Sequence, residues 1–185
     1  MIKIIGIGGC GSAVNKGLSK EILNKCECIL LGSRSYPVPK SENLGEIFSR
    51  LEGVSLTILV ASLGCETGSK LALDIGNGLK ELGLPAIAFT TLPFTLEDGI
   101  YMDRALAERL SEYLKNKVDY IKVFDSDDTL GIVPNAEDML TSELLDVIDQ
   151  QIISIIERII ERYGHKDTLS EVDTQDIGEM LTQGK

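Results

Sequence analysis

The sequence predicts an α/β protein whose core is a three-layer, doubly wound and mostly parallel sheet. Short apolar runs alternate with segments of helical periodicity along most of the chain. Two of the apolar runs end in glycine-rich turns, and 43% of the 185 residues are hydrophobic, enough for one sizeable core. Strands that alternate with helices pair in parallel, and their functional loops gather at the carboxyl ends of the strands.

Charge and cysteine content exclude several classes of protein. A net charge of −11 disfavours nucleic acids and anionic membranes as partners. A membrane span needs an apolar run of about 18 residues, and the sequence has none. The first residues also lack the cleavage site of a signal peptide. Four cysteines, one histidine and no CxxC pair disfavour zinc sites and disulfide scaffolds. We therefore expect a reduced, cytoplasmic protein without a metal site.

The first strand–turn–helix unit begins at the N-terminus. Residues 2–7 form an apolar strand, followed by Gly6-x-Gly8-x-x-Gly11 and a helix to about Leu23. This spacing is the dinucleotide fingerprint, in which glycines permit the turn and let phosphate approach backbone amides. A glycine-rich turn with no ligand is the plainer interpretation of the same residues.

A second unit of the same kind covers residues 55–82. It is predicted to contain a buried strand over residues 56–61, a loop over 62–68 and a helix from Ser69. Gly64 and Gly68 allow a tight turn, and the helix start offers unpaired N–H groups to an anion. Glu66 conflicts with this, because its carboxylate lies where a phosphate would bind.

The remaining short elements complete the alternation. We expect strands over residues 28–31, 86–91 and 120–124, and helices over 44–51 and about 101–115. The last strand is followed by three carboxylates, which could hold a divalent cation but are more simply a solvated turn or a helix cap: Asp125, Asp127 and Asp128.

The longest helix is predicted over residues 141–163. Its leucine and isoleucine side chains fill about half of its circumference, whereas a surface helix needs a stripe of only roughly 100°. The excess indicates burial against a second domain or another subunit, or else a helix sunk in a groove of its own domain. The segment over residues 165–185 is polar, and a solvated end is its usual explanation, although Asp173-x-x-Asp176 places two carboxylates on one side of a turn.

Taken in order, these segments resemble the nucleotide-binding half of the FtsZ/tubulin family over nearly the whole chain. Residues 4–11 resemble the first phosphate loop, and residues 51–69 resemble the segment leading into the tubulin signature. Pro93-Phe94-x-Leu96-Glu97 resembles the family's P-F-x-F-E element. Residues 171–176 resemble N-x-D-x-x-D, the synergy loop that completes the GTPase site of the next subunit in a filament.

The resemblance implies a Rossmann-like nucleotide-binding domain and a division of the chain into three parts. These are the nucleotide-binding domain over residues 1–140, the central helix over 141–164 and an acidic tail resembling the synergy loop over 165–185. The family's second domain is expected to be absent. Self-association through the long helix is expected, and a full-length FtsZ-like protein is a further expected partner.

The resemblance also implies a site for GTP or GDP, with Mg²⁺ as the ion that screens the phosphate charge. Asp173 and Asp176 are the implied catalytic residues, acting on a neighbouring subunit's nucleotide. The implied nucleotide-binding residues are Gly8, Gly9, Cys10, Gly11, Ser12, Gly64, Cys65, Thr67, Gly68, Ser69, Glu97, Ser126 and Asp146.

Several residues depart from the family pattern. Cys65, Glu66 and Lys70 replace glycines of the signature loop. A like charge about 4 Å from a phosphate costs on the order of 1–4 kcal/mol in solvated surroundings. Ser126 replaces the asparagine that reads the base, and Tyr101 replaces an arginine near the γ-phosphate.

Three functions remain open on these residues. The first is a GTP-binding protein of cell division or the cytoskeleton, with weak, assembly-dependent GTPase activity. The second is a degenerate member that no longer hydrolyses GTP and acts as a regulator or scaffold. The third is an NADP-binding oxidoreductase domain, because Ser33-Arg34-Ser35 follows the second strand where a 2′-phosphate could be held.

Overall fold

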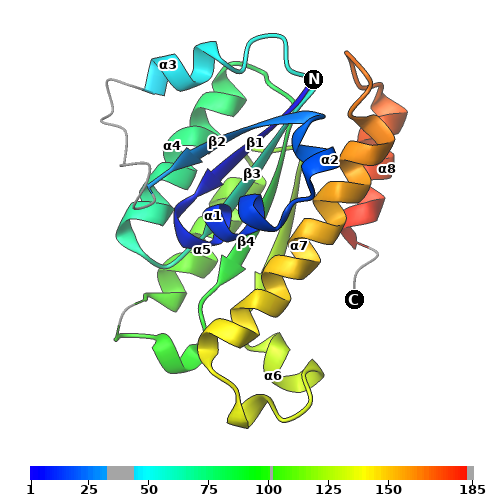
Figure 1. Cartoon of the computed structure of the whole chain (residues 1–185). Helices are drawn as coiled ribbons and strands as arrows, with labels where there is room; N and C mark the ends of the chain where they lie inside the picture. The colour runs from blue at the N-terminus through cyan, green and yellow to red at the C-terminus, as the bar shows by residue number, and fades with distance from the viewer. Residues whose placement is uncertain (33–43, 101, 183–185) are drawn as a thin grey trace.

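The computed structural model describes residues 1–32, 44–100 and 102–182, without the side chains of residues 66 and 67. Its centre is a five-stranded, all-parallel sheet in the order β2-β1-β3-β4-β5 (Figure 1). The doubly wound, three-layer fold predicted from the sequence is confirmed. The strands are β1 (Ile2–Ile7), β2 (Cys26–Leu31), β3 (Leu56–Ser62), β4 (Ala86–Leu92) and β5 (Tyr120–Asp125).

Helices cover both faces of the sheet, and each face has its own apolar cluster. One face carries α1 (Gly8–Gly17), α2 (Lys20–Leu23), α7 (Thr141–Tyr163) and α8 (Glu171–Thr182). The opposite face carries α3 (Leu44–Ser49), α4 (Glu66–Glu81) and α5 (Arg104–Lys115). Three short helices follow β4 and β5: η2 (Thr95–Glu97), α6 (Asp128–Ile132) and η3 (Ala136–Asp138).

Double coverage explains the almost continuous apolar sequence of the central strands. In β1, Ile2 and Ile4 pack under α1 and α7, whereas Ile5 and Ile7 face α4. A strand buried on both faces has no solvent-facing side that would require polar residues. Lys3 is the exception, and its ammonium forms an ion pair of 2.8 Å with Glu27 on β2.

Several predicted boundaries were wrong. The helix expected to run from the first glycine turn to about Leu23 is broken at Leu18 and Ser19, whose backbones are extended, so that α1 and α2 are separate. The second glycine loop is shorter than predicted, because α4 begins at Glu66 and not at Ser69. β2 begins at Cys26, two residues before the predicted start.

Helix α7 has the bounds predicted for it, but its apolar excess is buried inside the chain. Nine of its side chains are buried, and none of its large apolar side chains is among the exposed ones. It packs on the sheet, on α1 and α2, and on α8. Of the interpretations left open, a helix buried by its own domain is the one observed. The apolar excess is therefore explained within the chain, and self-association through this helix stays a prediction.

Residues Glu171–Thr182 form helix α8, in the segment where the sequence suggested a solvated acidic tail. Ile177 is fully buried, and Met180 and Leu181 are nearly so. The Gly178 backbone lies so close to the Tyr120 ring that a Cβ would overlap it. α8 therefore packs on the amino end of β5 and covers part of α7. In the described part of the chain, no helix is long and apolar enough to cross a lipid bilayer.

Candidate functional site

The first candidate anion-binding element is the turn between β1 and α1. Helix α1 starts directly at Gly8, whose φ of +68° lies in the left-handed region that favours glycine. Ile7, at the N-cap, provides no side-chain hydrogen bond to the first-turn amides. Gly9 is exposed, and a Cβ on Gly8 or Gly9 would meet no atom within 4 Å. The amides at this helix start therefore border open space, as phosphate binding requires.

The spacing of the remaining glycines of this turn is explained by packing. A Cβ on Gly11 would overlap the Gly6 backbone, and a Cβ on Gly6 would lie 2.8 Å from the Gly11 carbonyl oxygen. The first turn of α1 consequently lies directly against β1, and the Gly11 Cβ position is only 3.2 Å from the Val60 carbonyl oxygen on β3. The fingerprint thus sets the close approach of helix and sheet.

Cys10 connects this turn to α7. Its thiol donates a hydrogen bond of 3.4 Å to Asp149 Oδ1. Burial raises the pKa of Cys10 well above its usual value, and the neighbouring Asp149 charge raises it further. Burial also raises the pKa of Asp149 to about 6, against the opposing effect of the Cys10 hydrogen bond and with a smaller rise from Asp146. Cys10 is thus a neutral thiol, and Asp149 is a carboxyl group that titrates near pH 6.

The second candidate element is the turn between β3 and α4, which begins at the same level because Ile7 pairs with Ala61. Gly64, with φ of +103°, donates its N–H to Ser69 Oγ at 3.1 Å. Cys65 is the N-cap of α4, and its sulfur accepts the Gly68 N–H at 3.3 Å. Cys65 and Ser69 thus stabilise the turn itself.

The predicted conflict at this second turn remains untested. The side chains of Glu66 and Thr67 lie outside the described part, as do Tyr101 and residues 33–43. The proposed roles of Thr67, Tyr101 and Ser33-Arg34-Ser35 therefore stay predictions.

The other predicted nucleotide-binding residues lie in positions less favourable for contact with a nucleotide. Ser126 is buried, and its hydroxyl donates a 2.6 Å hydrogen bond to the Leu92 carbonyl, so it points into the protein and not toward a base. Glu97 is half-buried and accepts the Phe94 N–H at 3.3 Å within its own loop. Ser12 lies half-buried in α1, and Asp146 is exposed on α7. Because the Ser126 hydroxyl is committed to the backbone, its role at the nucleotide stays a prediction.

An arginine that the sequence analysis missed holds the loops after β4 and β5 together. Arg104, at the start of α5, donates to the Pro93 carbonyl at 2.6 Å and to both carboxylate oxygens of Asp125. It also forms an ion pair of 3.4 Å with Asp127, which accepts the Thr95 N–H at 3.0 Å. Asp125 and Asp127 are therefore both paired with the Arg104 guanidinium of the same chain. In the described part, no group of three or more histidine, cysteine or acidic residues could hold a metal ion.

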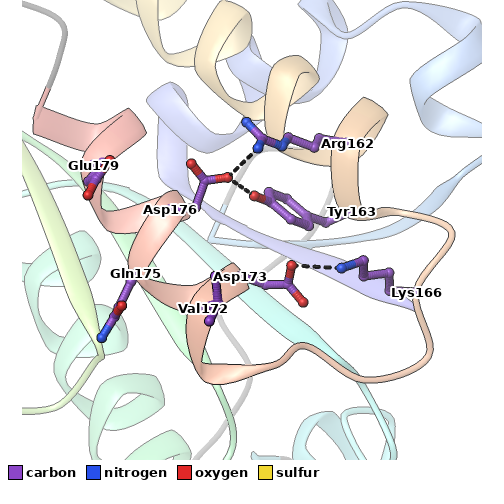
Figure 2. A pocket seen from close by; sticks show the side chains of 8 residues that line it. All are labelled: Arg162, Tyr163, Lys166, Val172, Asp173, Gln175, Asp176 and Glu179. Atoms are coloured by element: carbon purple, nitrogen blue, oxygen red, sulfur yellow. Dashed lines mark hydrogen bonds and ion pairs between the residues drawn. The ribbon is translucent and has the colours of Figure 1, made fainter.

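The predicted catalytic residues lie in a different place. Asp173 and Asp176, on α8, line an open pocket of about 550 Å³ between the end of α7 and α8 (Figure 2). Asp173 forms a 2.7 Å ion pair with Lys166 and accepts the N–H and hydroxyl of Ser170 at 2.9 and 2.8 Å. The Lys166 hydrogen bond, with those from Ser170, lowers the pKa of Asp173 to about 2.

The Asp176 carboxylate also has partners within the chain. It forms an ion pair of 2.9 Å with Arg162 and accepts the Tyr163 hydroxyl (Figure 2). We call this set of contacts the α7–α8 clasp: Arg162, Tyr163 and Lys166 with Asp173 and Asp176. The clasp lies toward the amino edge of the sheet, as Figure 1 shows, whereas both glycine turns lie at the carboxyl edge. Asp173 and Asp176 are therefore remote from the chain's own glycine turns.

Asp149 had a recognisable signal in the sequence. It interrupts the apolar half of α7, between Leu145 and Ile153 one helical turn away on either side. A charged residue inside a buried stripe needs a partner. Arg104 had no such signal, because Asp125 and Asp127 become its neighbours only after β4 and β5 have paired.

Sequence comparison identifies curated relatives for most of the chain. The cell division protein FtsZ 1 of Thermococcus kodakarensis and that of Methanocaldococcus jannaschii are each 29% identical to it over 143 residues, which is 77% of this chain. The match covers 37% and 38% of those proteins, so the chain spans about two fifths of their length. No protein-family model matches the sequence.

Solved structures share the fold. An empty FtsZ dimer from M. jannaschii has a TM-score of 0.70 at 19% identity, with 89% of this chain and 55% of that chain covered. CetZ from Methanosaeta thermophila has a TM-score of 0.66 at 19% identity, with 99% and 58% covered. Sequence and fold point to the same group of proteins.

Proposed function

This chain is an FtsZ/tubulin-like protein, and from that premise we propose that it serves a cell-division or cytoskeletal system without hydrolysing GTP. In this proposal it holds the phosphates of GTP or GDP at the β1–α1 turn and acts as a regulator or scaffold. The observation that carries the proposal is the α7–α8 clasp, in which both expected catalytic carboxylates have intrachain partners.

Nucleotide binding is supported by the geometry of the β1–α1 turn. The open space beside Gly8 and Gly9 leaves room for phosphate oxygens at the start of α1. Mg²⁺ would screen the phosphate charge, which matters because the chain carries a net charge of −11. Recognition of the base is weakened, since the buried Ser126 hydroxyl offers no contact to it.

Loss of hydrolysis is supported by the state of Asp173 and Asp176. A group that positions a water must have a lone pair within hydrogen-bond reach of it. Lys166 and Ser170 already bind Asp173, and Arg162 and Tyr163 already bind Asp176. A neighbouring subunit's nucleotide would have to displace these partners before either carboxylate could act.

A binding experiment with a matched control tests the proposal. Gly9→Asp places a carboxylate at the open turn, and Gly45→Asp places one at another exposed helical glycine with nothing within 4 Å of its Cβ. In thermal-shift and calorimetric titrations with Mg²⁺, GTP and GDP should stabilise wild type and Gly45→Asp but not Gly9→Asp. Stabilisation by NADPH alone would instead favour the oxidoreductase hypothesis, although neither relative named above is an oxidoreductase.

The rate of GTP hydrolysis distinguishes the assembly-dependent GTPase from the non-hydrolysing regulator or scaffold. We expect no GTP hydrolysis at any protein concentration. A rate per subunit that rises with protein concentration would overturn the proposal in favour of an assembly-dependent GTPase. Glu66→Gly should strengthen GTP binding, because it removes a like charge from the α4 start, while leaving hydrolysis absent.

In this proposal, the carboxyl edge of the sheet is the surface through which the chain self-associates. Leu96, Leu130 and Ile132 are exposed there to 62%, 44% and 62%, and the Thr95–Asp127 hydrogen bond of 3.0 Å ties their two loops together. Exposed apolar patches of this kind are typical of protein interfaces. In sedimentation velocity, Ile132→Lys should dissociate any oligomer, whereas Leu82→Lys, at a separate exposed leucine after α4, should not.

A further inference from the structure

The carboxyl group of Asp149 lies beside the phosphate turn, and the proposed function gives it no role. It is half-buried on α7, and the Cys10 thiol donates a 3.4 Å hydrogen bond to its Oδ1. Cys10 is the third residue of α1, directly after Gly9. Side chains tilt toward the amino end of their helix, so the thiol leans back toward the turn. Asp149 is therefore held beside the first turn of α1, where Gly8 and Gly9 border open space.

No cation of the described residues forms an ion pair with Asp149. The charged group that acts on it is Asp146, one turn earlier on α7. The elements packed beside this end of α7 are α6 and η3, and their charged residues are all acidic: Asp128, Glu137 and Asp138. When Asp149 is ionised, its negative charge therefore has no compensating cation from these elements.

The other elements around α7 carry their cations elsewhere. Lys16 lies in the last turn of α1, and α2, which carries Lys20, meets α7 near Glu157, about two turns farther along α7. On the sheet, the Lys122 ammonium donates to the Leu181 carbonyl of α8 at 2.7 Å. The cations of the clasp belong to the far end of α7. These positions separate the cations from the phosphate turn.

A negative charge at this position opposes phosphate binding. The amino end of a helix has a partial positive charge that stabilises an anion within the first turn, and a carboxylate there offsets it. Like charges about 8 Å apart in partly buried surroundings shift a binding equilibrium by roughly tenfold. The 3.4 Å hydrogen bond to the third residue of α1 places the carboxylate at about that range from a phosphate held by the first amides. Neutralising Asp149 removes this penalty.

We propose that the β1–α1 turn binds phosphate tightly when the Asp149 carboxyl group is protonated and weakly when it is ionised. This coupling rests on the proposed function, because it regulates the same turn. Phosphate binding draws a proton from solvent onto a carboxylate oxygen of Asp149, and protonation raises phosphate affinity by the same factor. Burial raises the pKa of Asp149 to about 6, against the effect of the Cys10 hydrogen bond, and so brings this titration close to neutral pH.

The test is a calorimetric titration of the full chain with GDP and Mg²⁺ at about pH 5 and about pH 7.5. Asp149→Asn is neutral at both pH values, so it should bind GDP roughly tenfold more tightly than wild type at the higher pH and equally at the lower. The phosphates of GDP titrate in the same range, and the ratio of variant to wild type cancels that effect. Glu161→Gln, which removes one charge from an exposed position near the other end of α7, should match wild type throughout.

The possible failures are distinguishable. A ratio that is the same at both pH values would overturn the coupling alone. Weaker binding by Asp149→Asn at both pH values would also overturn it, because the carboxylate would then be a direct contact of the ligand. If wild type bound no nucleotide at either pH, the proposed function would be refuted and the coupling with it.

Proton uptake is a second readout, which a merely structural role of Asp149 would not change. It is obtained by repeating the GDP titration near pH 6.5 in two buffers of different ionisation enthalpy. A tenfold coupling requires wild type to take up roughly half a proton more per bound GDP than Asp149→Asn does. Equal proton uptake by the two proteins would contradict the coupling.

Discussion

The two edges of the sheet differ in what their motifs do. At the carboxyl edge, the glycines of the β1–α1 turn have the conformations and close contacts that their spacing predicts. At the amino edge, Asp173-x-x-Asp176 has the spacing of a catalytic loop, yet both carboxylates are bound by α7 and the connection that follows it. The difference shows that a motif built on backbone geometry can be interpreted locally. A motif built on side-chain chemistry depends on what packs against it.

The largest expected effect concerns the amino edge. Ile177→Ala removes a fully buried side chain that holds α8 on the sheet, and should cost about 2–5 kcal/mol of unfolding free energy. Val172→Ala, on the same helix but 73% exposed, should change stability by less than about 0.5 kcal/mol. Urea denaturation of both variants checks this. Equal midpoints would mean that α8 is a solvated tail after all.

A substitution at the carboxyl edge should lower the unfolding free energy somewhat less. Gly11→Ala forces a Cβ into the Gly6 backbone, which cannot move aside as a flexible side chain could, so we expect a loss of about 1–3 kcal/mol. Gly9→Ala is the matched control, because its Cβ meets nothing and alanine favours the helix. Chemical denaturation should place Gly9→Ala at or above wild type. A Gly11→Ala midpoint equal to that of wild type would contradict the packing argument.

The pH dependence of stability tests the contact between α1 and α7. The folded pKa of Asp149 is raised to about 6 from 3.8, so between these values the folded protein retains a proton that the unfolded chain has lost. Stability from this group is therefore present below about pH 4 and is lost as the pH rises through about 6. After a discount for partial exposure, the loss should be about 1–2 kcal/mol.

The matched variant for this prediction is Asp149→Asn, which keeps an acceptor for the Cys10 thiol. Its unfolding free energy should decline less than that of wild type between pH 4 and pH 7. Parallel profiles for the two proteins would show that Asp149 does not titrate in this window.

The smallest effect is expected from the clasp itself. The folded pKa of Asp173 is lowered to about 2, so its contribution is present above about pH 4 and is lost as the pH falls through about 2. Asp173→Asn should therefore loosen α8 without unfolding the chain, and should raise hydrogen–deuterium exchange in Glu171–Thr182 at neutral pH. Exchange in α4 serves as the internal reference. Unchanged exchange in α8 would show that apolar packing alone holds it.

Much of the fold was predictable because each local pattern agreed with its surroundings. The apolar run of β1 and the glycines after it predicted strand, turn and helix start, and the bounds of β1 and α7 were predicted correctly. The start of α4 was misplaced by three residues, because a cysteine sulfur served as N-cap where no cap was expected. Ser126 was assigned to the site by alignment, and only its bond to the Leu92 carbonyl showed that it points inward.

The sequence by itself determined the fold class, the elements and the glycine turns, because periodicity and the conformational limits of glycine act within a few residues. The tertiary structure alone decided which surfaces of α7 are free and which carboxylates have partners. Those properties depend on residues far apart in the chain, such as Cys10 and Asp149 or Arg104 and Asp125. Burial and charge pairing are settled only when these residues meet, and the acidic residues Asp173 and Asp176 of α8 likewise gain their partners from α7 and from Lys166 only in the folded chain.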